Sequence, residues 1–302
     1  MALGYDKPLY ILAFDHRGSF VKKFFGITGQ PDPEQSERIS DAKSVIFEGF
    51  QKAIDDGAPK DAGGILVDEQ FGADIVRRAK KDGYLFAMPT EMSGQDEYEF
   101  EYGDDFATHI EEFDPTFSKV LVRYNVEADQ GMNRRQAERL KRLGDWLHDN
   151  GRRFLFELLV PATDEQLAGV GGDDDRYDKE VRPELMRRAI AELHDRGVEA
   201  DIWKIEGIDQ REDCEKISAE VRSGGRDGVA CVVLGRGADD AAVEHWLKTG
   251  AGVPGYIGFA IGRTIWWDSL KAYVDGETDR EKAAAGIAEK YRRMIAVYTG
   301  AA

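Results

Sequence analysis

The sequence predicts an α/β fold, a single (β/α)₈ TIM barrel spanning residues 1–302, with an excursion after the third strand and a mobile loop after the fifth. Three observations predict it. The chain has 302 residues, and such barrels take ~250 residues plus insertions. Short apolar runs alternate with amphipathic stretches, as expected of parallel strands joined by helices. The apolar runs are eight in number, which is the number that closes this barrel.

The apolar runs are the predicted strands. In chain order they are Leu9–Phe14, Ile65–Val67, Tyr84–Met88, Val120–Tyr124, Phe154–Val160, Ile202–Ile205, Ala230–Leu234 and Tyr256–Ile261. An open doubly wound sheet is the structural alternative, but its first strand usually ends in a glycine-rich loop. Here the first run ends in Asp15-His16-Arg17-Gly18. The sequence therefore favours the barrel.

Between the runs, apolar residues recur every three or four positions, which predicts helices. These stretches are Ser36–Asp55, Arg134–Asn150, Pro183–Arg196, Glu212–Ser223 and Asp239–Thr249, followed by the closing helix Arg280–Tyr298. Two segments interrupt the alternation. Glu91–Asp114 alternates acidic and aromatic residues and predicts an ordered excursion, because its aromatic side chains need a surface to pack on. Gly169–Asp178 is rich in glycine and aspartate and predicts the mobile loop.

Composition and charge exclude several classes of protein. A hydrophobic fraction of 42% excludes wholesale disorder. The net charge of −17 repels phosphate backbones, so no nucleic-acid partner is expected. No apolar run reaches the ~18 residues of a membrane span, and the first residues lack the apolar core of a signal peptide, so no membrane partner is expected. Two cysteines, Cys214 and Cys231, make no disulfide framework, which favours a cytoplasmic protein.

Ionisable residues fall on the inward faces of four predicted strands. Side chains alternate between the two faces of a strand, so the bulky apolar residues that face the helices leave the others inside. By this rule the barrel interior contains Asp15, Arg17, Lys119, Arg123, Glu157, Lys204 and Glu206. One alternative is a salt-bridged core that pairs Lys119 with Glu157 and Lys204 with Glu206. Convergence at one barrel mouth instead favours an active site.

Two interior lysines and two interior carboxylates suit Schiff-base chemistry. A second cation in a low-dielectric site favours the neutral form of an amine, and a neutral lysine attacks carbonyl groups. The resulting iminium promotes aldol cleavage without a metal or cofactor, while carboxyl groups move the protons. The alternative is a metal-dependent aldolase in which Asp15, Asp68 and Glu69 hold Mg²⁺. Only His16 among five histidines adjoins a strand end, so no metal site is expected.

Two glycine–arginine pairs predict a phosphate site. Gly235-Arg236 follows the seventh predicted strand, and Gly262-Arg263 follows the eighth. Barrels commonly bind phosphate at these two loops, through backbone N–H groups and a helix N-terminus. Arginine adds a bidentate cation. The pairs would also form a basic patch that draws an anionic substrate to the mouth.

Taken together, these residues resemble the class I aldolases of the tagatose-1,6-bisphosphate aldolase type. They are still more similar to the aldolase-like domain fused to 5-dehydro-2-deoxygluconokinase, the 2-deoxy-5-keto-gluconate 6-phosphate aldolase type. The resemblance covers essentially the whole chain. It is carried by Leu12–Gly18, Gly64–Gly72, Lys119–Tyr124, Phe156–Leu159, Trp203–Glu206 and Gly258–Arg263.

The resemblance implies a lyase that needs no metal and no cofactor. Lys204 would be the Schiff-base lysine, Glu157 the acid/base, and Lys119 the cation that favours neutral Lys204. Asp15 would orient or deprotonate a substrate hydroxyl. The expected contacts with substrate or phosphate come from Arg17, Arg123, Gly235, Arg236, Gly262 and Arg263. The implied reaction, from inositol catabolism, cleaves 5-dehydro-2-deoxygluconate 6-phosphate into dihydroxyacetone phosphate and malonate semialdehyde.

Arg123 departs from the family pattern, because a tagatose-type enzyme would have tyrosine there. An interior arginine could hold a substrate carboxylate, which favours a phosphorylated keto acid over a bisphosphate sugar, or it could neutralise Glu157 as a structural pair. Three alternatives remain: a tagatose- or fructose-bisphosphate aldolase, a non-catalytic phosphosugar-binding barrel, and an isomerase or epimerase in which Glu157 is the base. The expected protein partners are a second copy of the chain, with Trp266 and Trp267 either at that interface or under the closing helix, and a separate sugar kinase.

Overall fold

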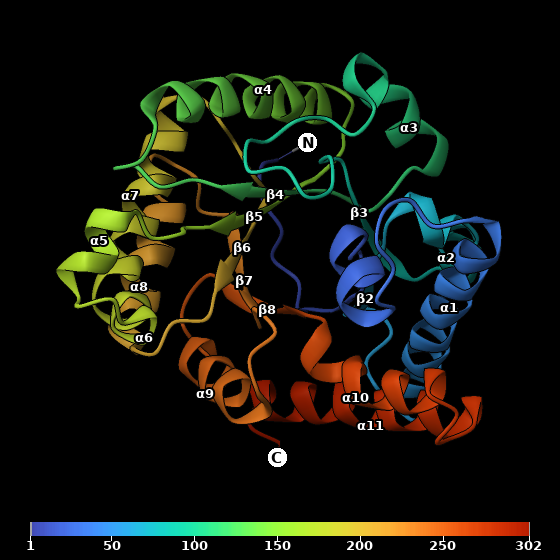
Figure 1. Cartoon of the computed structure of the whole chain (residues 1–302). Coiled ribbons are helices and arrows are strands. Elements are labelled where there is room, and N and C mark those ends of the chain that lie inside the picture. Colours follow the sequence, from blue (N-terminus) through green and yellow to red (C-terminus); the bar gives the residue numbers. More distant parts are fainter. Residues whose placement is uncertain (1, 302) are drawn as a thin grey trace.

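The computed structural model describes residues 2–301, and its eight strands form a closed parallel barrel (Figure 1). The strands are β1 (Leu9–Ala13), β2 (Gly63–Leu66), β3 (Leu85–Pro89), β4 (Phe117–Arg123), β5 (Phe154–Leu159), β6 (Ile202–Glu206), β7 (Ala230–Leu234) and β8 (Tyr256–Ile261). Each pairs with its neighbours in chain order, and β1 pairs with β8 to close the ring. The predicted barrel is confirmed, and the open sheet is excluded.

Helices surround the barrel (Figure 1). They are α1 (Pro33–Asp55), α2 (Glu69–Asp82), α3 (Phe106–Phe113), α4 (Gln130–Asp149), α5 (Asp164–Gly169), α6 (Asp174–Arg176), α7 (Arg182–Asp195), α8 (Arg211–Val221), α9 (Asp240–Gly250), α10 (Arg263–Val274) and α11 (Arg280–Thr299), with short turns η1 (Phe20–Phe24), η2 (Gly103–Asp105) and η3 (Tyr177–Val181). Side chains fix several helix starts. Asp32 accepts a hydrogen bond from Gln35 N at 2.8 Å, with Pro33 in the first turn of α1.

The barrel interior has an apolar floor. Residues alternate along β1, so that Leu9, Ile11 and Ala13 lie in the interior cluster, whereas Tyr10 and Leu12 lie in the outer cluster under the helices. The other strands contribute Leu66, Ala87, Phe117, Leu155, Ile202, Val232 and Ala260 to the interior cluster. Inward polar side chains therefore begin only above this floor, toward the carboxyl ends of the strands.

The two segments that interrupt the alternation of strands and helices, Glu91–Asp114 and Gly169–Asp178, differ in structure. The excursion after β3 is ordered as predicted: Glu91 and Phe100 form an isolated antiparallel bridge, and the Phe100 and Phe106 rings stack with centroids 4.5 Å apart. The segment Gly169–Asp178 was expected to be a loop, but it contains the end of α5, all of α6 and the start of η3. Its mobility stays a prediction.

The last helices complete the outer layer beside the first. α11 packs against both α1 and α10 (Figure 1). Trp266 of α10 is fully buried, and its indole N–H donates to the Ala13 carbonyl at 2.9 Å. Trp267 packs with its ring centroid 4.9 Å from that of Phe24. Both tryptophans therefore pack against residues of the same chain.

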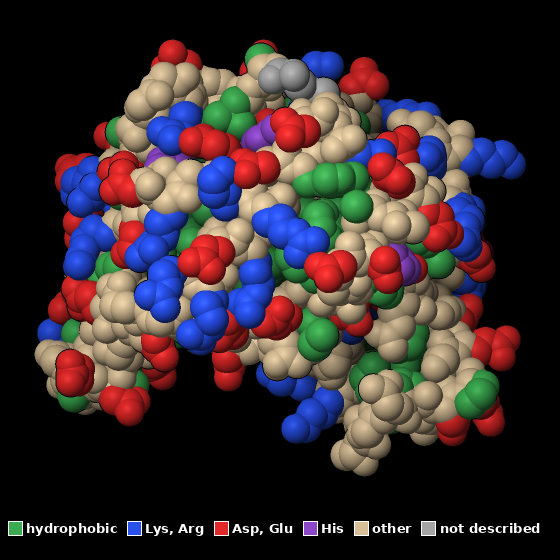
Figure 2. All heavy atoms as spheres, turned by 90° about the horizontal axis from the view of Figure 1, so that it is seen from above, with side chains coloured by type: hydrophobic (Ala, Val, Ile, Leu, Met, Phe, Trp, Pro, Cys, Tyr) green, Lys and Arg blue, Asp and Glu red, His purple; other side chains and the backbone are tan. Residues whose placement is uncertain are grey.

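The surface carries charges of both signs. On the face shown in Figure 2, Lys and Arg side chains are interspersed with Asp and Glu side chains, so the net charge of −17 does not form a single acidic patch there. Within residues 2–301, no helix combines the length and apolar character needed to cross a membrane.

Candidate active site

Strand register places Glu157 beside Lys204. The two residues are register partners on β5 and β6, and Leu121 of β4 is the partner of Glu157 on its other side. Register partners on neighbouring strands point to the same face and lie ~4.8 Å apart. Lys119 precedes Leu121 by two residues, so it shares that inward face. Three ionisable side chains thus meet because of sheet geometry alone.

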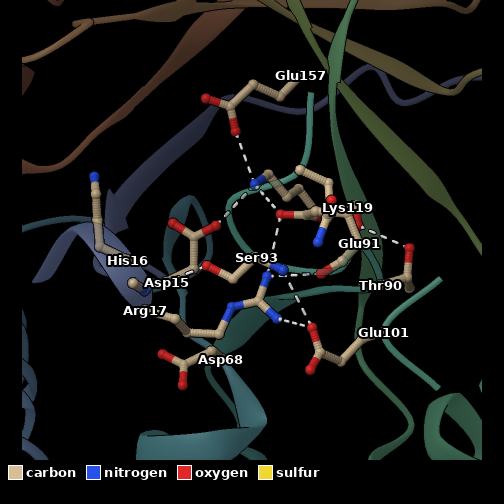
Figure 3. Close-up of polar contacts among 12 residues, drawn as sticks. Asp15, His16, Arg17, Asp68, Thr90, Glu91, Ser93, Glu101, Lys119 and Glu157 are labelled. Carbon is tan, nitrogen blue, oxygen red and sulfur yellow. Dashed lines mark hydrogen bonds and ion pairs between the residues drawn. The ribbon is translucent and has the colours of Figure 1, made fainter. Parts of the chain in front are cut away.

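The Lys119 ammonium is the centre of this cluster (Figure 3). Its Nζ lies 2.8 Å from Asp15 Oδ2, 2.9 Å from Glu91 Oε1 and 2.9 Å from Glu157 Oε2. The other Glu157 oxygen, Oε1, lies 3.0 Å from Lys204 Nζ. The Lys119 and Lys204 side chains are only 1% and 5% exposed. The structure therefore brings together the four residues predicted as catalytic, and Glu157 bridges the two lysines.

Glu206 is not the partner of Lys204. It accepts a hydrogen bond from Val160 N at 2.9 Å and forms ion pairs with Arg182 at 3.6 Å and Arg236 at 3.3 Å. The Lys204–Glu206 half of the salt-bridged alternative is therefore wrong, whereas its Lys119–Glu157 pair is present at 2.9 Å. Glu206 lies at the last position of β6, where Val160 and Arg236 from the loops after β5 and β7 and Arg182 from the start of α7 supply its partners.

The cluster lines a cavity of about 210 Å³. Its walls include the four predicted catalytic residues, and among the predicted substrate-contacting residues they include Arg17 and Arg123. The excursion supplies the remaining side, from Glu91 through Gln95. A cavity with buried, converging charges is the usual form of a small-molecule site.

The two arginines of this cavity are held differently. Arg17 forms ion pairs with Glu101 at 2.9 Å and Glu91 at 3.5 Å, so carboxylates of the chain already neutralise it (Figure 3). Arg123 donates to the Gln95 carbonyl at 2.9 Å, whereas the ion-pair partners of Glu157 are the two lysines. The expected structural pairing of Arg123 with Glu157 does not occur. The other N–H groups of the Arg123 guanidinium are available to donate to a ligand.

The loops after β7 and β8 lie outside this cavity wall. Arg236 pairs with Asp178 and Glu206, so its charge is largely taken up by the chain. Arg263 donates to the Arg236 carbonyl at 2.9 Å and lines a neighbouring hollow of about 690 Å³ with Gly237. Gly235 and Gly262 adjoin these arginines at the ends of β7 and β8. Among the predicted phosphate ligands, Arg263 thus has the freer side chain.

The Arg236 backbone has φ +53°, a conformation that non-glycine residues rarely adopt. Gly237 follows it with φ +76°. Such strain is often found where a loop must present its backbone to a ligand.

Sequence reasoning missed Glu91 as a site residue. It directly follows Thr90 beyond β3, where strand alternation no longer fixes the direction of a side chain. The available signal was its position, since barrel active sites use residues at the carboxyl ends of strands. Glu91 Oε2 is buried without a hydrogen-bond partner among the described residues, and its side chain lines the cavity. His16, the one histidine that was predicted to adjoin a strand end, also lines this cavity.

Burial and charge set different protonation states in the cluster. Burial acts to lower the pKa of Lys119, but Asp15, Glu157 and Glu91 outweigh it and raise that pKa well above its usual value. Burial opposes ionisation of Asp15 and Glu157, yet Lys119 holds the pKa of each carboxyl below its usual value. For Glu91, burial wins over Lys119 and Arg17 and raises the pKa. The site thus combines a permanent cation, two carboxylates and a carboxyl group that is easier to protonate.

The residues of the magnesium alternative have other partners. Asp68 pairs with Lys43, and Glu69 lies 3.0 Å from His109 Nδ1. Among residues 2–301, no three or more His, Cys, Asp or Glu side chains are grouped to hold a metal ion. These contacts give no support to the alternative in which Asp15, Asp68 and Glu69 hold Mg²⁺.

Three comparisons relate the chain to known proteins. A family model described as "Uncharacterized protein conserved in bacteria (DUF2090)" matches residues 4–302. Among solved structures, a fructose-bisphosphate aldolase from Slackia heliotrinireducens DSM 20476 is 15% identical with a TM-score of 0.55, over 94% of this chain and 86% of that chain. Cgl0159 from Corynebacterium glutamicum (Brevibacterium flavum) is 17% identical with a TM-score of 0.58, over 97% of this chain and 88% of that one. At sequence identities this low, the similarity to the two solved structures shows a shared fold alone. The comparison with curated proteins found no match.

Proposed function

We propose that this chain, which belongs to the DUF2090 family, is a metal-independent class I aldolase that acts through a Schiff base on Lys204. One observation carries the proposal: Glu157 bridges Lys204 and Lys119 inside a cavity that Asp15 also lines. The shared fold with a fructose-bisphosphate aldolase supports the general reaction class. The finer assignments rest on the residues of this chain.

The first half of the reaction uses Lys204 and Glu157. Glu157 Oε1, 3.0 Å from Lys204 Nζ, accepts a proton from the ammonium. The neutral amine then attacks the substrate ketone and forms a carbinolamine. Protonated Glu157 returns its proton to the carbinolamine oxygen, which leaves as water, and a C=N⁺ iminium remains. Lys119 stays charged throughout and keeps the Glu157 carboxyl acidic.

The second half uses Asp15. As the carboxylate, it removes a proton from the hydroxyl two carbons from the iminium carbon. The bond between the hydroxyl-bearing carbon and the carbon adjacent to the iminium breaks, the hydroxyl-bearing carbon leaves as an aldehyde, and the bond electrons form the C=C bond of an enamine on Lys204. Protonated Asp15 returns its proton to the enamine carbon, and water hydrolyses the resulting iminium to release the ketone and free Lys204. Atoms and electrons balance without an oxidant or reductant.

The substrate we favour is a phosphorylated keto acid. Arg123 lines the cavity with free donors, and a guanidinium binds a carboxylate with two parallel hydrogen bonds. Arg263, with Gly235 and Gly262, would hold the phosphate at the loops after β7 and β8. The best match is 5-dehydro-2-deoxygluconate 6-phosphate, which yields dihydroxyacetone phosphate and malonate semialdehyde. Fructose or tagatose bisphosphate is the alternative substrate, since it carries a second phosphate in place of the carboxylate.

Borohydride trapping tests the proposal. The protein is incubated with 5-dehydro-2-deoxygluconate 6-phosphate or fructose 1,6-bisphosphate and reduced, and the modified peptide is identified by mass spectrometry. We expect a stable adduct on Lys204, and release of dihydroxyacetone phosphate in a coupled assay. Lys204→Ala should abolish both, whereas Lys248→Ala, at an exposed lysine of α9, should change neither.

The other outcomes identify the alternatives. Activity that EDTA abolishes, with no adduct, would indicate a metal-dependent aldolase. Ligand binding that survives Lys204→Ala, with no turnover by the unmodified protein, would indicate a phosphosugar-binding barrel. A single product with all carbons retained would indicate an isomerase or epimerase. Each of these would refute the Schiff-base proposal.

A further inference from the structure

We propose that Lys43 and Asp68 are positioning residues, which hold the end of β1 so that the Asp15 carboxylate points at Lys119. The proposal rests on the function proposed above and adds to it two residues that do not themselves line the catalytic cavity. Neither residue lies in a strand of the barrel, because Lys43 belongs to α1 and Asp68 immediately precedes α2.

The Lys43 ammonium binds both carbonyls that flank Asp15. Its Nζ donates to Phe14 O at 2.9 Å and to His16 O at 3.0 Å, and its third partner is Asp68 Oδ1. The other Asp68 oxygen accepts from Phe71 N at 2.9 Å and caps α2. One pair of charges therefore ties together α1, the end of β1 and the start of α2.

The Lys43–Asp68 ion pair lies in the core, where two apolar side chains would avoid the free-energy cost of burying charges. The Lys43 and Asp68 side chains are 0% and 1% exposed. Lys43 lies on the buried stripe of α1, four residues after Ile39 and four before Phe47. Burying two charges often stabilises a fold no more than hydrophobic residues of similar size would. The presence of this pair in the core therefore suits a role besides packing.

The geometry supplies that role. The regular strand β1 ends at Ala13, and one further sheet-type hydrogen bond, from Phe14 N to Leu66 O at 2.8 Å, holds the residue before Asp15. The carbonyls of Phe14 and His16 depend instead on a side-chain donor. Lys43 provides a donor for the carbonyl before Asp15 and for the carbonyl after it. Trp266 holds the Ala13 carbonyl in the same way. With the backbone fixed, the Asp15 side chain is directed inward to its 2.8 Å contact with Lys119.

The test separates positioning from stability. In Lys43→Met, Asp68 is left as an unpaired buried charge, so the fold itself is expected to weaken. The double variant Lys43→Met with Asp68→Asn removes both charges and keeps an oxygen to cap α2. We expect the double variant to regain most of the urea midpoint of the unmodified protein, yet to cleave substrate at least tenfold more slowly. Borohydride trapping on Lys204 should be unchanged, because Asp15 acts after the iminium has formed.

A crystal structure of the double variant provides a second measurement. We expect the Asp15–Lys119 contact to be lost or lengthened beyond hydrogen-bonding distance. Full turnover by the stable double variant, or an unchanged contact in its structure, would overturn the proposal. Lys52→Met, at an exposed lysine of the same helix, is the matched control and should leave every measurement unchanged. If the unmodified protein gives neither adduct nor cleavage, the proposed function fails, and the crystal structure alone decides the positioning role.

Discussion

Glu157 places one carboxylate oxygen on each of two buried ammonium groups, and this sharing governs what Lys204 can do. Lys119 keeps its charge because three carboxylates surround it, so it acts as a fixed positive neighbour. Lys204 has Glu157 as its ion-pair partner, which gives its proton an acceptor inside the cavity. A proton can therefore move between the amine and the carboxylate without passing through solvent.

Replacing Glu157 with Gln tests this proton transfer. Glutamine keeps the shape of the side chain but cannot accept the Lys204 proton as a carboxylate does. We expect turnover to fall about 10²–10⁴-fold, the usual contribution of a general acid or base. The rate of adduct formation on Lys204 should fall in parallel, measured by quenched borohydride trapping. Glu180→Gln, at an exposed ion pair with Arg176, should have no effect; a fully active Glu157→Gln enzyme would remove Glu157 from the mechanism.

Arg123 is the residue that we propose sets the preferred substrate class. Arg123→Met keeps the aliphatic stem and removes the charge that a substrate carboxylate would meet. We expect KM for the keto-acid phosphate to rise by about 10–100-fold, corresponding to ~1.5–3 kcal/mol for a charge-assisted hydrogen bond. KM for fructose 1,6-bisphosphate should change much less. Steady-state kinetics with both substrates provides the measurement, and equal changes for the two would argue against carboxylate recognition.

Alternation along strands was sufficient to predict which charged residues meet. Lys119, Glu157 and Lys204 lie within regular strands, so their direction followed from the positions of their apolar neighbours. Glu91 and Lys43 could not be placed in this way. The first lies beyond the end of β3, and the second reaches β1 from a helix, so both depend on how segments far apart in sequence pack together.

At the scale of elements, the excursion after β3 is anchored to α4 through Gln136. The buried Gln136 side chain accepts from Tyr98 N at 2.8 Å and donates to the Arg123 carbonyl at 3.0 Å. On the surface, Glu97 pairs with Arg135 at 2.7 Å and Arg139 at 2.6 Å. The excursion that covers one side of the cavity is thus fixed to the helix that follows β4.

Gln136→Leu should loosen this anchor. Leucine fills the space but leaves Tyr98 N and the Arg123 carbonyl without their partner, so we expect a loss of about 1–3 kcal/mol in the free energy of unfolding. Urea denaturation measures the loss. Limited proteolysis should cut within residues 91–105 faster than in the unmodified protein. Glu138→Gln, at an exposed position of α4, is the control; equal proteolysis of the two variants would contradict the anchoring role.

Most of the repeating elements were predictable because each one carries its own local pattern, although α2 and α10 were not among the predicted helices. Each of the eight apolar runs overlaps a strand of the barrel, and the closing helix was expected to begin at Arg280, where α11 begins. The short helices within Gly169–Asp178 were not predicted. Three-residue elements such as α6 have no periodicity to detect, and their glycine and aspartate residues are typical of loops.

At the scale of the whole molecule, buried histidines link stability to pH. His194 has no hydrogen-bond partner for either ring nitrogen among the described residues, and burial, together with Arg226, lowers its pKa to about 4. Burial, together with Arg263, also lowers the pKa of His16 to about 4. Unfolded histidine has a pKa of ~6.5, so between pH 6.5 and 4 the unfolded chain binds more protons than the native chain. The free energy of unfolding contributed by these groups therefore falls as pH decreases through this range.

His194→Leu should reduce this loss. We expect the drop in unfolding free energy between pH 7 and pH 4.5 to be smaller by about 2 kcal/mol than in the unmodified protein, from a pKa difference of ~2.5. Urea denaturation at the two pH values measures it. His148 contributes with the opposite sign, because its hydrogen bond to Asp201 raises its pKa, and it is unchanged in this variant. His245→Leu, at an exposed histidine, is the control; equal pH dependence in both variants would contradict the prediction.

The pairing of β1 with β8 has a consequence for the order in which the molecule assembles. Strand β1 can pair with β8 only after residues 256–261 have been synthesised. The packing of α11 against α1 likewise requires the last residues of the chain. Contacts across such sequence separations form slowly, because a long loop must first be closed. On the ribosome, Asp15 and Lys204 are synthesised before the ring can shut around them. The ring of strands around the charged cluster therefore cannot close until residues 256–261 have been synthesised.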